Sequence, residues 1–250
     1  PLSQWCAFLR NHDELTLEMV TEDERQYMWE QYAPVPRMRL NLGIRRRLAP
    51  LLDNDLRRIK LLNAILFTLP GSPIIYYGDE IGMGDDIWRH DRNGLRTPMQ
   101  WDASRNAGFS GAEKLYEPVI DDDTYNCRRV NVADQQADPN SLWSAIRYML
   151  TVRKRYRAFG RGTFAFALPD NEAVLGYWRA YDGDGTDGVE VERFLVLFNL
   201  TDQPQQTTLD LAEYAGRTPV DVLTDEAWPG IRSATHNLNL APFAFHWLRL

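Results

Sequence analysis

Cysteine and histidine are scarce in this 250-residue sequence, which has two cysteines and four histidines. Cys6 and Cys127 are far apart in the sequence, so they form neither a disulfide framework nor a zinc motif. The histidines are scattered, without the spacing of metal ligands. We therefore expect no metal site in this chain. The cysteine usage fits a reducing compartment, which predicts a cytoplasmic protein.

An excess of positive charge and long hydrophobic runs are also absent. The formal net charge of -7 argues against nucleic acid, which proteins bind mainly through clustered Lys and Arg side chains. No apolar run approaches the roughly 20 residues that a membrane-spanning helix needs. Hydrophobic residues make up 44% and charged residues 25% of the chain, as in ordinary globular proteins. We therefore expect neither nucleic acid nor a membrane as a partner.

The first half of the chain alternates between strand-like and helix-like segments. Apolar runs at 5–9 and 73–77 are typical of buried strands, and hydrophobic residues at helical spacing predict a helix over 54–68. This order is typical of an α/β fold with a parallel sheet. The long stretches 15–50 and 78–138 are charged and irregular, which predicts structured loops near a functional site.

A last helix, expected over 141–159, precedes a change to short strands. From about residue 163, apolar or alternating segments separated by turn residues predict an antiparallel β-sandwich. The expected strands include 173–178, 193–199, 206–210, 219–223 and 244–249. The predicted domains are therefore 1–162 and 163–250. Residues 183–188 match the pattern G-x-G-x-x-G, but no helix follows them, so we interpret them as a hairpin tip rather than a nucleotide site.

A polar cluster ends the first expected strand. Asn11, His12 and Asp13 directly follow the apolar run 5–9, and strands of parallel barrels carry their chemistry where the strand ends. A carboxylate next to an imidazole at such a point is suited to holding a sugar. The alternative is an ordinary His-Asp pair with a structural role.

Several blocks of sequence carry a family resemblance. They are Phe8–Glu18, Gly43–Pro50, Tyr76–Gly84, Asp91–Trp101 and Arg105–Ser110. In this order they resemble the C-terminal part of trehalose synthases, the maltose α-glucosyltransferases of the α-amylase superfamily, and the resemblance continues to the end of the chain. Asn-His-Asp is common across the superfamily. The block Tyr76–Gly84 followed by Arg105–Ser110 points more narrowly to trehalose synthases.

The resemblance implies a (β/α)₈ barrel followed by a β-sandwich domain. Residues 4–9 and 73–77 would be barrel strands seven and eight, and 141–159 the last barrel helix. The chain starts with Pro1, and we expect six earlier strands, the nucleophilic aspartate and the acid/base glutamate to precede it. We therefore expect residues 1–250 alone to be inactive. We expect no cofactor in this chain, and any calcium site would belong to the preceding part.

The resemblance also implies roles for four residues. Asp13 would be a catalytic residue that stabilises the transition state, while His12 would donate a hydrogen bond to the same sugar ring. Arg96 would bind the 4-hydroxyl of the terminal glucose, with a structural ion pair as the alternative. Asn11 would orient Asp13 or cap a turn.

Other polar and aromatic side chains near these blocks allow two interpretations each. Asp79 and Glu80 follow the second expected strand and are either a catalytic pair or supports for a loop, the latter being favoured by the resemblance. Trp88 and Trp101 either pack in the fold or stack on a sugar.

The implied reaction is the interconversion of maltose and trehalose with retention at the transferred centre. The glucose released from maltose would turn in the pocket and attack the glucosyl-enzyme, with water kept out by the long loops. The expected partners are maltose, trehalose and glucose. One alternative is an exo-acting α-glucosidase, a hydrolase, and another is a non-catalytic sugar-binding remnant. The oligomeric state is left open, a homo-oligomer included.

Overall fold

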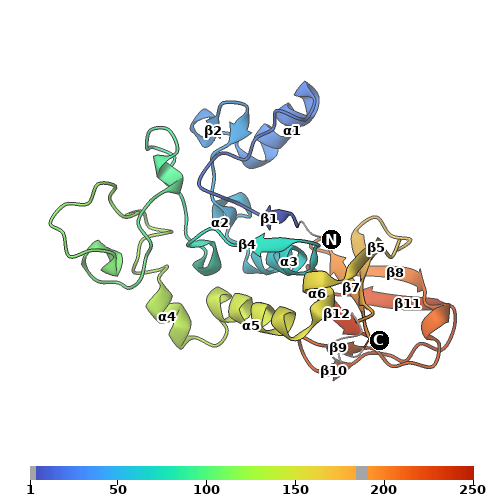
Figure 1. Cartoon of the computed structure of the whole chain (residues 1–250). Coiled ribbons are helices and arrows are strands. Elements are labelled where there is room, and N and C mark those ends of the chain that lie inside the picture. Colours follow the sequence, from blue (N-terminus) through green and yellow to red (C-terminus); the bar gives the residue numbers. More distant parts are fainter. Residues whose placement is uncertain (1–3, 184–190) are drawn as a thin grey trace. The chain divides into compact units, whose positions relative to one another are not determined.

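A computed structural model describes residues 4–183 and 191–250, and the chain divides into two compact units (Figure 1). The first unit comprises Pro1–Ala7, Lys60–Pro73 and Arg147–Leu250, and the second comprises Phe8–Ile59 and Ile74–Ile146. The hairpin tip predicted at 183–188 lies outside the described residues except for its first glycine. It therefore stays a prediction, as do the domain bounds 1–162 and 163–250.

The first 161 residues form short strands and helices, and none of the helices in the described parts of the chain is long and apolar enough to traverse a membrane. The elements are β1 (Cys6–Phe8), α1 (Glu22–Tyr32), η1 (Pro36–Met38), β2 (Arg39–Leu40), β3 (Gly43–Ile44), α2 (Leu48–Leu51), α3 (Leu56–Thr68), β4 (Ser72–Ile74), η2 (Asp79–Ile81), η3 (Asn93–Leu95), η4 (Arg105–Gly108), α4 (Val132–Ala137), α5 (Leu142–Arg155) and α6 (Arg157–Arg161), where η denotes a 3₁₀ helix.

The helix predicted over 54–68 is confirmed as α3, which begins at Leu56. The carboxylate of Asp55, just before it, accepts a hydrogen bond from the backbone N–H of Arg57 at 2.9 Å, as an N-terminal cap does. The helix predicted over 141–159 ends earlier than expected. Tyr156 has an extended backbone (φ -118°, ψ 124°), which separates α5 from α6.

The prediction of an irregular stretch over 15–50 is wrong, because α1 lies within it. Thr21 and Glu24 form a reciprocal capping box, in which the Thr21 hydroxyl accepts from Glu24 N and the Glu24 carboxylate accepts from Thr21 N. None of the α1 residues is buried, so hydrophobic periodicity gives no signal for it. Its helical character depends on this cap and on an acidic first turn.

The two strands predicted to be buried are exposed, which corrects that prediction. β1 and β4 pair with each other in a two-stranded sheet, and Phe8 and Ile74 are 45% and 47% exposed. β4 also ends at Ile74, three residues before the predicted end. Among the described strands no other pairs with β1 or β4, so the outer edge of each lacks a strand partner.

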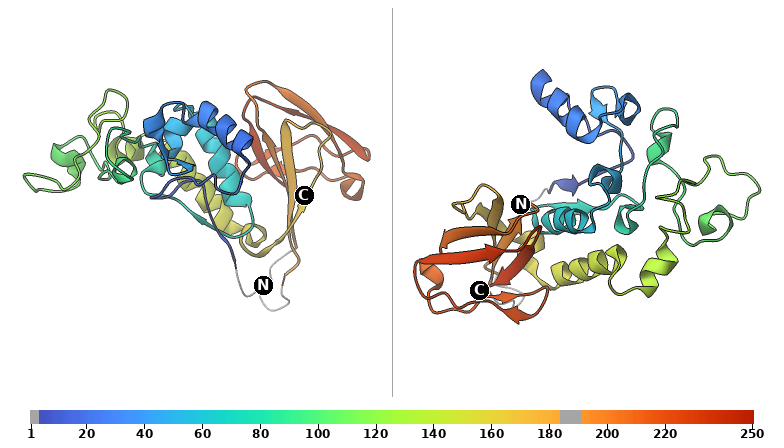
Figure 2. Two further views of the ribbon diagram at one scale, coloured as in Figure 1. Left: turned by 90° about the horizontal axis from the view of Figure 1, so that it is seen from above. Right: turned by 180° about the vertical axis from the view of Figure 1, so that it is seen from behind.

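The antiparallel β-sandwich predicted after residue 163 is confirmed (Figures 1 and 2). A six-stranded sheet has the order β10-β9-β12-β7-β6-β5, and β11 pairs with β8 in a second sheet. All of these pairs are antiparallel. The elements are β5 (Thr163–Phe166), β6 (Val174–Tyr181), β7 (Glu192–Asn199), β8 (Gln205–Asp210), η5 (Ala212–Tyr214), β9 (Val220–Asp221), β10 (Glu226–Ala227), β11 (Thr235–Leu240) and β12 (Phe245–Arg249).

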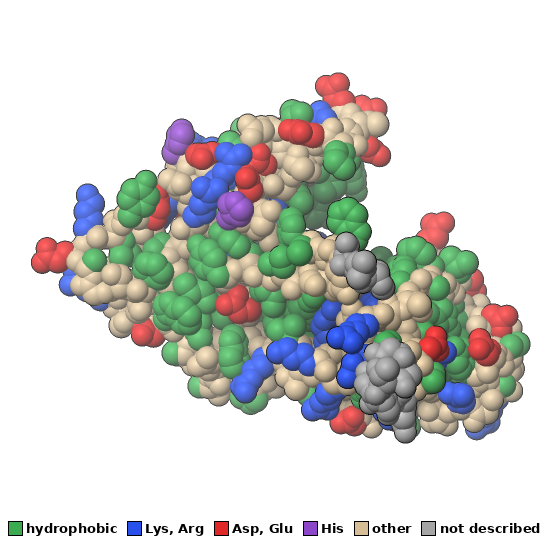
Figure 3. All heavy atoms as spheres, in the orientation of Figure 1, with side chains coloured by type: hydrophobic (Ala, Val, Ile, Leu, Met, Phe, Trp, Pro, Cys, Tyr) green, Lys and Arg blue, Asp and Glu red, His purple; other side chains and the backbone are tan. Residues whose placement is uncertain are grey.

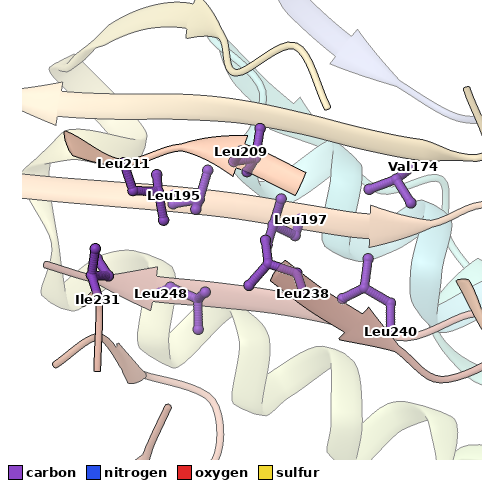
Figure 4. Close-up of a cluster of buried hydrophobic side chains, with 9 residues drawn as sticks. All are labelled: Val174, Leu195, Leu197, Leu209, Leu211, Ile231, Leu238, Leu240 and Leu248. Atoms are coloured by element: carbon purple, nitrogen blue, oxygen red, sulfur yellow. The ribbon is translucent and has the colours of Figure 1, made fainter. Parts of the chain in front are cut away.

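A core of aliphatic side chains joins these two sheets. Leu195 and Leu197 of β7 contribute from the larger sheet, and Leu209 and Leu238 from the smaller one (Figure 4). The period of two along each strand places alternate residues on this face. β11 shows the same alternation in Leu238 and Leu240, although the sequence analysis did not single it out.

Candidate active site

The turn after β1 holds the backbone of Asp13 from several sides. The side-chain oxygen of Asn11 accepts a hydrogen bond from Asp13 N at 2.8 Å, and the buried Arg10 donates to Asp13 O at 3.0 Å. Asp13 Oδ1 accepts from Glu14 N at 2.8 Å. Asn11 therefore caps this turn through the backbone N–H of Asp13, while its role in orienting the Asp13 carboxylate stays a prediction.

The segment after Glu14 is tied to β3. Leu15 and Ile44 exchange backbone hydrogen bonds of 2.8 and 2.9 Å. Gly43 lies so close that a Cβ atom there would be 2.5 Å from Leu15 O. A glycine is therefore required at this position for the two segments to meet.

Three buried arginines, Arg10, Arg45 and Arg47, hold the backbone around this site. They are 2%, 6% and 1% exposed. Their guanidinium groups donate mainly to main-chain carbonyls. These are the carbonyls of Asp13, Ile44 and Arg46 for Arg10, those of Arg37, Ile87, Arg89 and Asp91 for Arg45, and that of Tyr77 for Arg47. Buried carbonyls need such donors, so the arginines fix the loops after β1 and β4.

The carboxylate of Asp13 meets the guanidinium of Arg92. Arg92 Nε donates to Asp13 Oδ1, while its two terminal nitrogens lie 2.8 Å from carboxylate oxygens of Glu14 and Asp91. A hydrogen bond with the Glu14 side chain, followed by the one from Arg92, holds the pKa of Asp13 well below its usual range. Asp13 is thus an anion with 39% of its side chain exposed, available to a ligand.

Arg96 reaches the same turn from the loop after β4. Its Nε donates to His12 O at 3.0 Å, and both residues are exposed. The structure therefore brings all four predicted site residues together: Asn11 bonds Asp13, and Arg96 bonds the peptide just before Asp13. Figure 3 shows charged and histidine side chains gathered in the region of the loop that follows β4, beside a hydrophobic surface.

Arg96 also lines a cavity of about 570 Å³. Its walls include Arg96, Glu80 and the aromatic side chains of Tyr77, Trp101 and Phe109. Trp101 is 50% exposed, which suits a stacking surface better than core packing. Burial raises the pKa of Glu80, and one of its buried carboxylate oxygens lacks a hydrogen-bond partner within the described structure.

Asp79 has the environment of a supporting residue. It is 4% exposed, and its Oδ1 lies 3.4 Å from Arg47 Nη1. Burial raises the pKa of Asp79 to about 7. A group so enclosed and paired favours the interpretation that Asp79 supports the loop. Trp88 is 71% exposed and lies under the guanidinium of Arg37 at 5.0 Å.

The sequence pattern does not reveal the roles of Arg92, Glu14 and the buried arginines Arg45 and Arg47. Glu14 follows Asp13 directly, and Arg92 lies four residues before Arg96 within a block that carried the resemblance. The available signal for these residues was the high frequency of arginine in segments that the sequence predicts to be loops. Arginine supplies several donors in a fixed geometry, which suits the clamping of separate carbonyls.

Comparisons with known families agree with this architecture. Residues 43–162 match the family Alpha-amylase, described as alpha amylase, catalytic domain, and residues 164–247 match the maltogenic amylase C-terminal domain. Residues 43–162 thus belong to the α-amylase catalytic-domain family, and residues 164–247 to the maltogenic amylase C-terminal domain family. The barrel part and the sandwich of this chain correspond to the C-terminal portion of the α-amylase fold.

Curated trehalose synthases resemble the chain over its whole length. A trehalose synthase of Pimelobacter sp. (strain R48) is 51% identical over 249 residues, which cover 99% of this chain and 43% of that protein. The trehalose synthase/amylase TreS of Mycobacterium tuberculosis (strain H37Rv) is 49% identical over 251 residues, which cover 100% of this chain and 41% of that protein. The chain therefore spans about two fifths of these relatives.

Solved structures of a trehalulose synthase share the fold. The trehalulose synthase MutB from Pseudomonas mesoacidophila MX-45 has a TM-score of 0.61 at 22% identity, over 98% of this chain and 43% of that one. A mutant of MutB has been solved in complex with glucose. At this level of identity the likeness shows the fold alone.

Proposed function

We propose that the protein containing this chain interconverts maltose and trehalose by intramolecular transfer of a glucosyl group, with retention of configuration. The observation that carries the proposal is the 51% identity to a trehalose synthase over 99% of the chain. Asp13 has an exposed, anionic carboxylate, and Arg96 donates a hydrogen bond to His12 O in the same turn. This arrangement is suited to binding a sugar ring.

In the proposed mechanism, the nucleophile and the acid/base lie outside this chain, and Asp13 assists them. The Asp13 carboxylate accepts hydrogen bonds from sugar hydroxyls, and these bonds strengthen as the ring approaches its oxocarbenium shape. His12 donates to a hydroxyl of the same ring. Arg96, on the loop after β4, binds the 4-hydroxyl of the terminal glucose. Only interactions that strengthen in the transition state raise the turnover number.

Product analysis of the full-length protein incubated with maltose tests the proposal. Trehalose is expected as the main product, because the released glucose stays in a closed site and attacks the glucosyl-enzyme before water does. Glucose as the dominant product would identify an exo-acting α-glucosidase instead. If maltose is bound but left unchanged, the protein is a sugar-binding remnant without catalysis.

Residues 1–250 alone are expected to give no turnover of maltose. Among the described strands β1 and β4 pair only with each other, which leaves their outer edges without a strand partner, and in the proposed mechanism the nucleophile lies outside this chain. The purified 250-residue chain and the full-length protein are compared at equal concentration. Conversion of maltose by the shorter chain would show that all catalytic groups lie within it.

A further inference from the structure

We propose that Arg92 is a positioning residue that holds Asp13 by Oδ1, so that Oδ2 is presented to the sugar. The inference rests on the proposed function, since it assumes a glucosyl group at Asp13. It concerns a residue that the sequence pattern around Asn11, His12 and Asp13 does not reveal, because Arg92 lies 79 positions further along the chain.

All three nitrogens of the Arg92 guanidinium face carboxylates. Nε donates to Asp13, one terminal nitrogen lies 2.8 Å from Glu14 Oε2, and the other lies 2.8 Å from Asp91 Oδ1. The second oxygen of Glu14 accepts from the Asn41 side chain at 2.7 Å. Glu14 is thus anchored independently of Arg92, and its Oε2 contributes an ion pair to the guanidinium without a hydrogen bond. Asp91 Oδ1 accepts a hydrogen bond from Arg92 Nη1. A lysine could not make this set of contacts, because its ammonium is a single point charge.

The backbone that carries Arg92 is fixed as well. The buried Arg45 donates to the carbonyls of Ile87 and Arg89 at 2.8 Å each, and also to that of Asp91. These carbonyls lie five, three and one residues before Arg92 in the chain. The position of the Arg92 side chain is therefore set at its base by Arg45 and at its tip by three carboxylates.

This arrangement distinguishes the two oxygens of Asp13. The hydrogen bonds from Arg92 Nε and Glu14 N both end on Oδ1. The side chain as a whole is 39% exposed, and neither of these two hydrogen bonds uses Oδ2, which is the oxygen that we infer is presented to the sugar. A carboxylate fixed through one oxygen is oriented before the substrate arrives, so reorientation does not add to the barrier.

A double-mutant cycle in the full-length enzyme tests the inference. We compare maltose consumption by the wild type, R92Q, D13N and the R92Q/D13N double variant. If Arg92 acts through Asp13, R92Q lowers kcat by about 10- to 100-fold when Asp13 is present and by less than about 2-fold in the D13N background. KM changes much less than kcat, because the loss falls mainly on the transition state. R92K is expected to recover part of the lost activity.

A control variant and a rescue experiment separate positioning from folding. R58Q removes an arginine whose partner is Asp53, outside the site, and should leave kcat unchanged. Guanidinium ion added to R92Q should restore part of kcat and should have no such effect on D13N. Equal losses from R92Q in both backgrounds, or no loss at all, would overturn the inference. The inference would also be overturned if neither added guanidinium nor the R92K substitution restored any of the lost activity.

Two separate measurements distinguish a failure of this inference from a failure of the proposed function. Maltose consumption reports glucosyl transfer whichever acceptor is used, whereas the trehalose-to-glucose ratio reports the acceptor. A wild type that forms only glucose contradicts the proposed isomerase, while the cycle still decides the role of Arg92. A wild type that consumes no maltose contradicts both.

Discussion

Arg47 Nη1 lies 3.4 Å from Asp79 Oδ1, and both side chains are almost fully shielded from solvent. The same nitrogen donates to Tyr77 O at 2.7 Å, and the guanidinium lies 4.6 and 4.8 Å from the ring centroids of Tyr76 and Tyr77. The buried guanidinium of Arg47 thus contacts several residues that follow β4. These contacts connect the loop that carries Arg92 and Arg96 to the end of the strand.

The raised pKa of Asp79 predicts a pH dependence of stability. Its pKa is about 7 in the folded chain and about 3.9 in an unfolded one. Between these values the folded state binds the extra proton, so the free energy of unfolding falls as pH rises from about 4 to 7. D79N lacks this proton, and its slope over that range should be less negative than that of the wild type by up to about 1.4 kcal/mol per pH unit.

Urea denaturation of the full-length protein at pH 5, 6 and 7.5 measures these slopes. The exposed Glu18 provides the control, since E18Q should keep the pH dependence of the wild type. Parallel curves for D79N and the wild type would mean that Asp79 is ionised throughout and fully compensated by Arg47.

Replacement of Asp13 by asparagine tests its catalytic role. D13N keeps the shape of the side chain but removes the charge, and we expect kcat for maltose to fall by about 10³-fold. E18Q, a nearby exposed carboxylate outside the site, should retain kcat. Thermal melting of both variants checks that the fold is intact. Near-normal turnover of D13N would remove Asp13 from the catalytic residues.

Arg96 is expected to act mainly on binding. R96Q loses the donor to the 4-hydroxyl, which is present in the ground state as well as in the transition state, so KM for maltose should rise by about 10-fold or more with a smaller change in kcat. Arg105 is a matched exposed arginine in the same loop, and R105Q should behave as wild type. If R96Q leaves KM unchanged and lowers only the melting temperature, the hydrogen bond to His12 O is its main role.

The sequence predicted those parts of the fold that depend on local hydrophobic pattern. α3 has apolar residues at helical spacing, and β7 contains a continuous apolar run, so the type and approximate position of both follow from the sequence. α1 was missed because none of its residues is buried. The capping box at Thr21 and Glu24 was the available signal for it.

Only those residues of the site that are adjacent in the sequence or lie in a recognisable family motif could be predicted. Asn11, His12 and Asp13 are adjacent in the sequence, and the family resemblance pointed to Arg96. The contact between Arg92 and Asp13 spans 79 positions, and ion pairs at that separation depend on how the loops are folded. The burial of Arg45 and Arg47 was equally unpredictable, because arginine in a loop is usually exposed.

Arg179 provides a test of the first compact unit. This residue of β6 is 1% exposed, and its guanidinium donates to the carbonyls of Thr68, Ala158, Gly162 and Thr163. R179M fills a similar volume but leaves buried carbonyls without donors. Each such loss costs about 1–3 kcal/mol, and relief from burying a charge offsets part of the total, so we expect the free energy of unfolding to fall by about 3 kcal/mol. Urea denaturation measures the change, with R161M at an exposed position of α6 as the control. Equal stability of R179M and R161M would show that these carbonyls find other donors, such as water, once the guanidinium is removed.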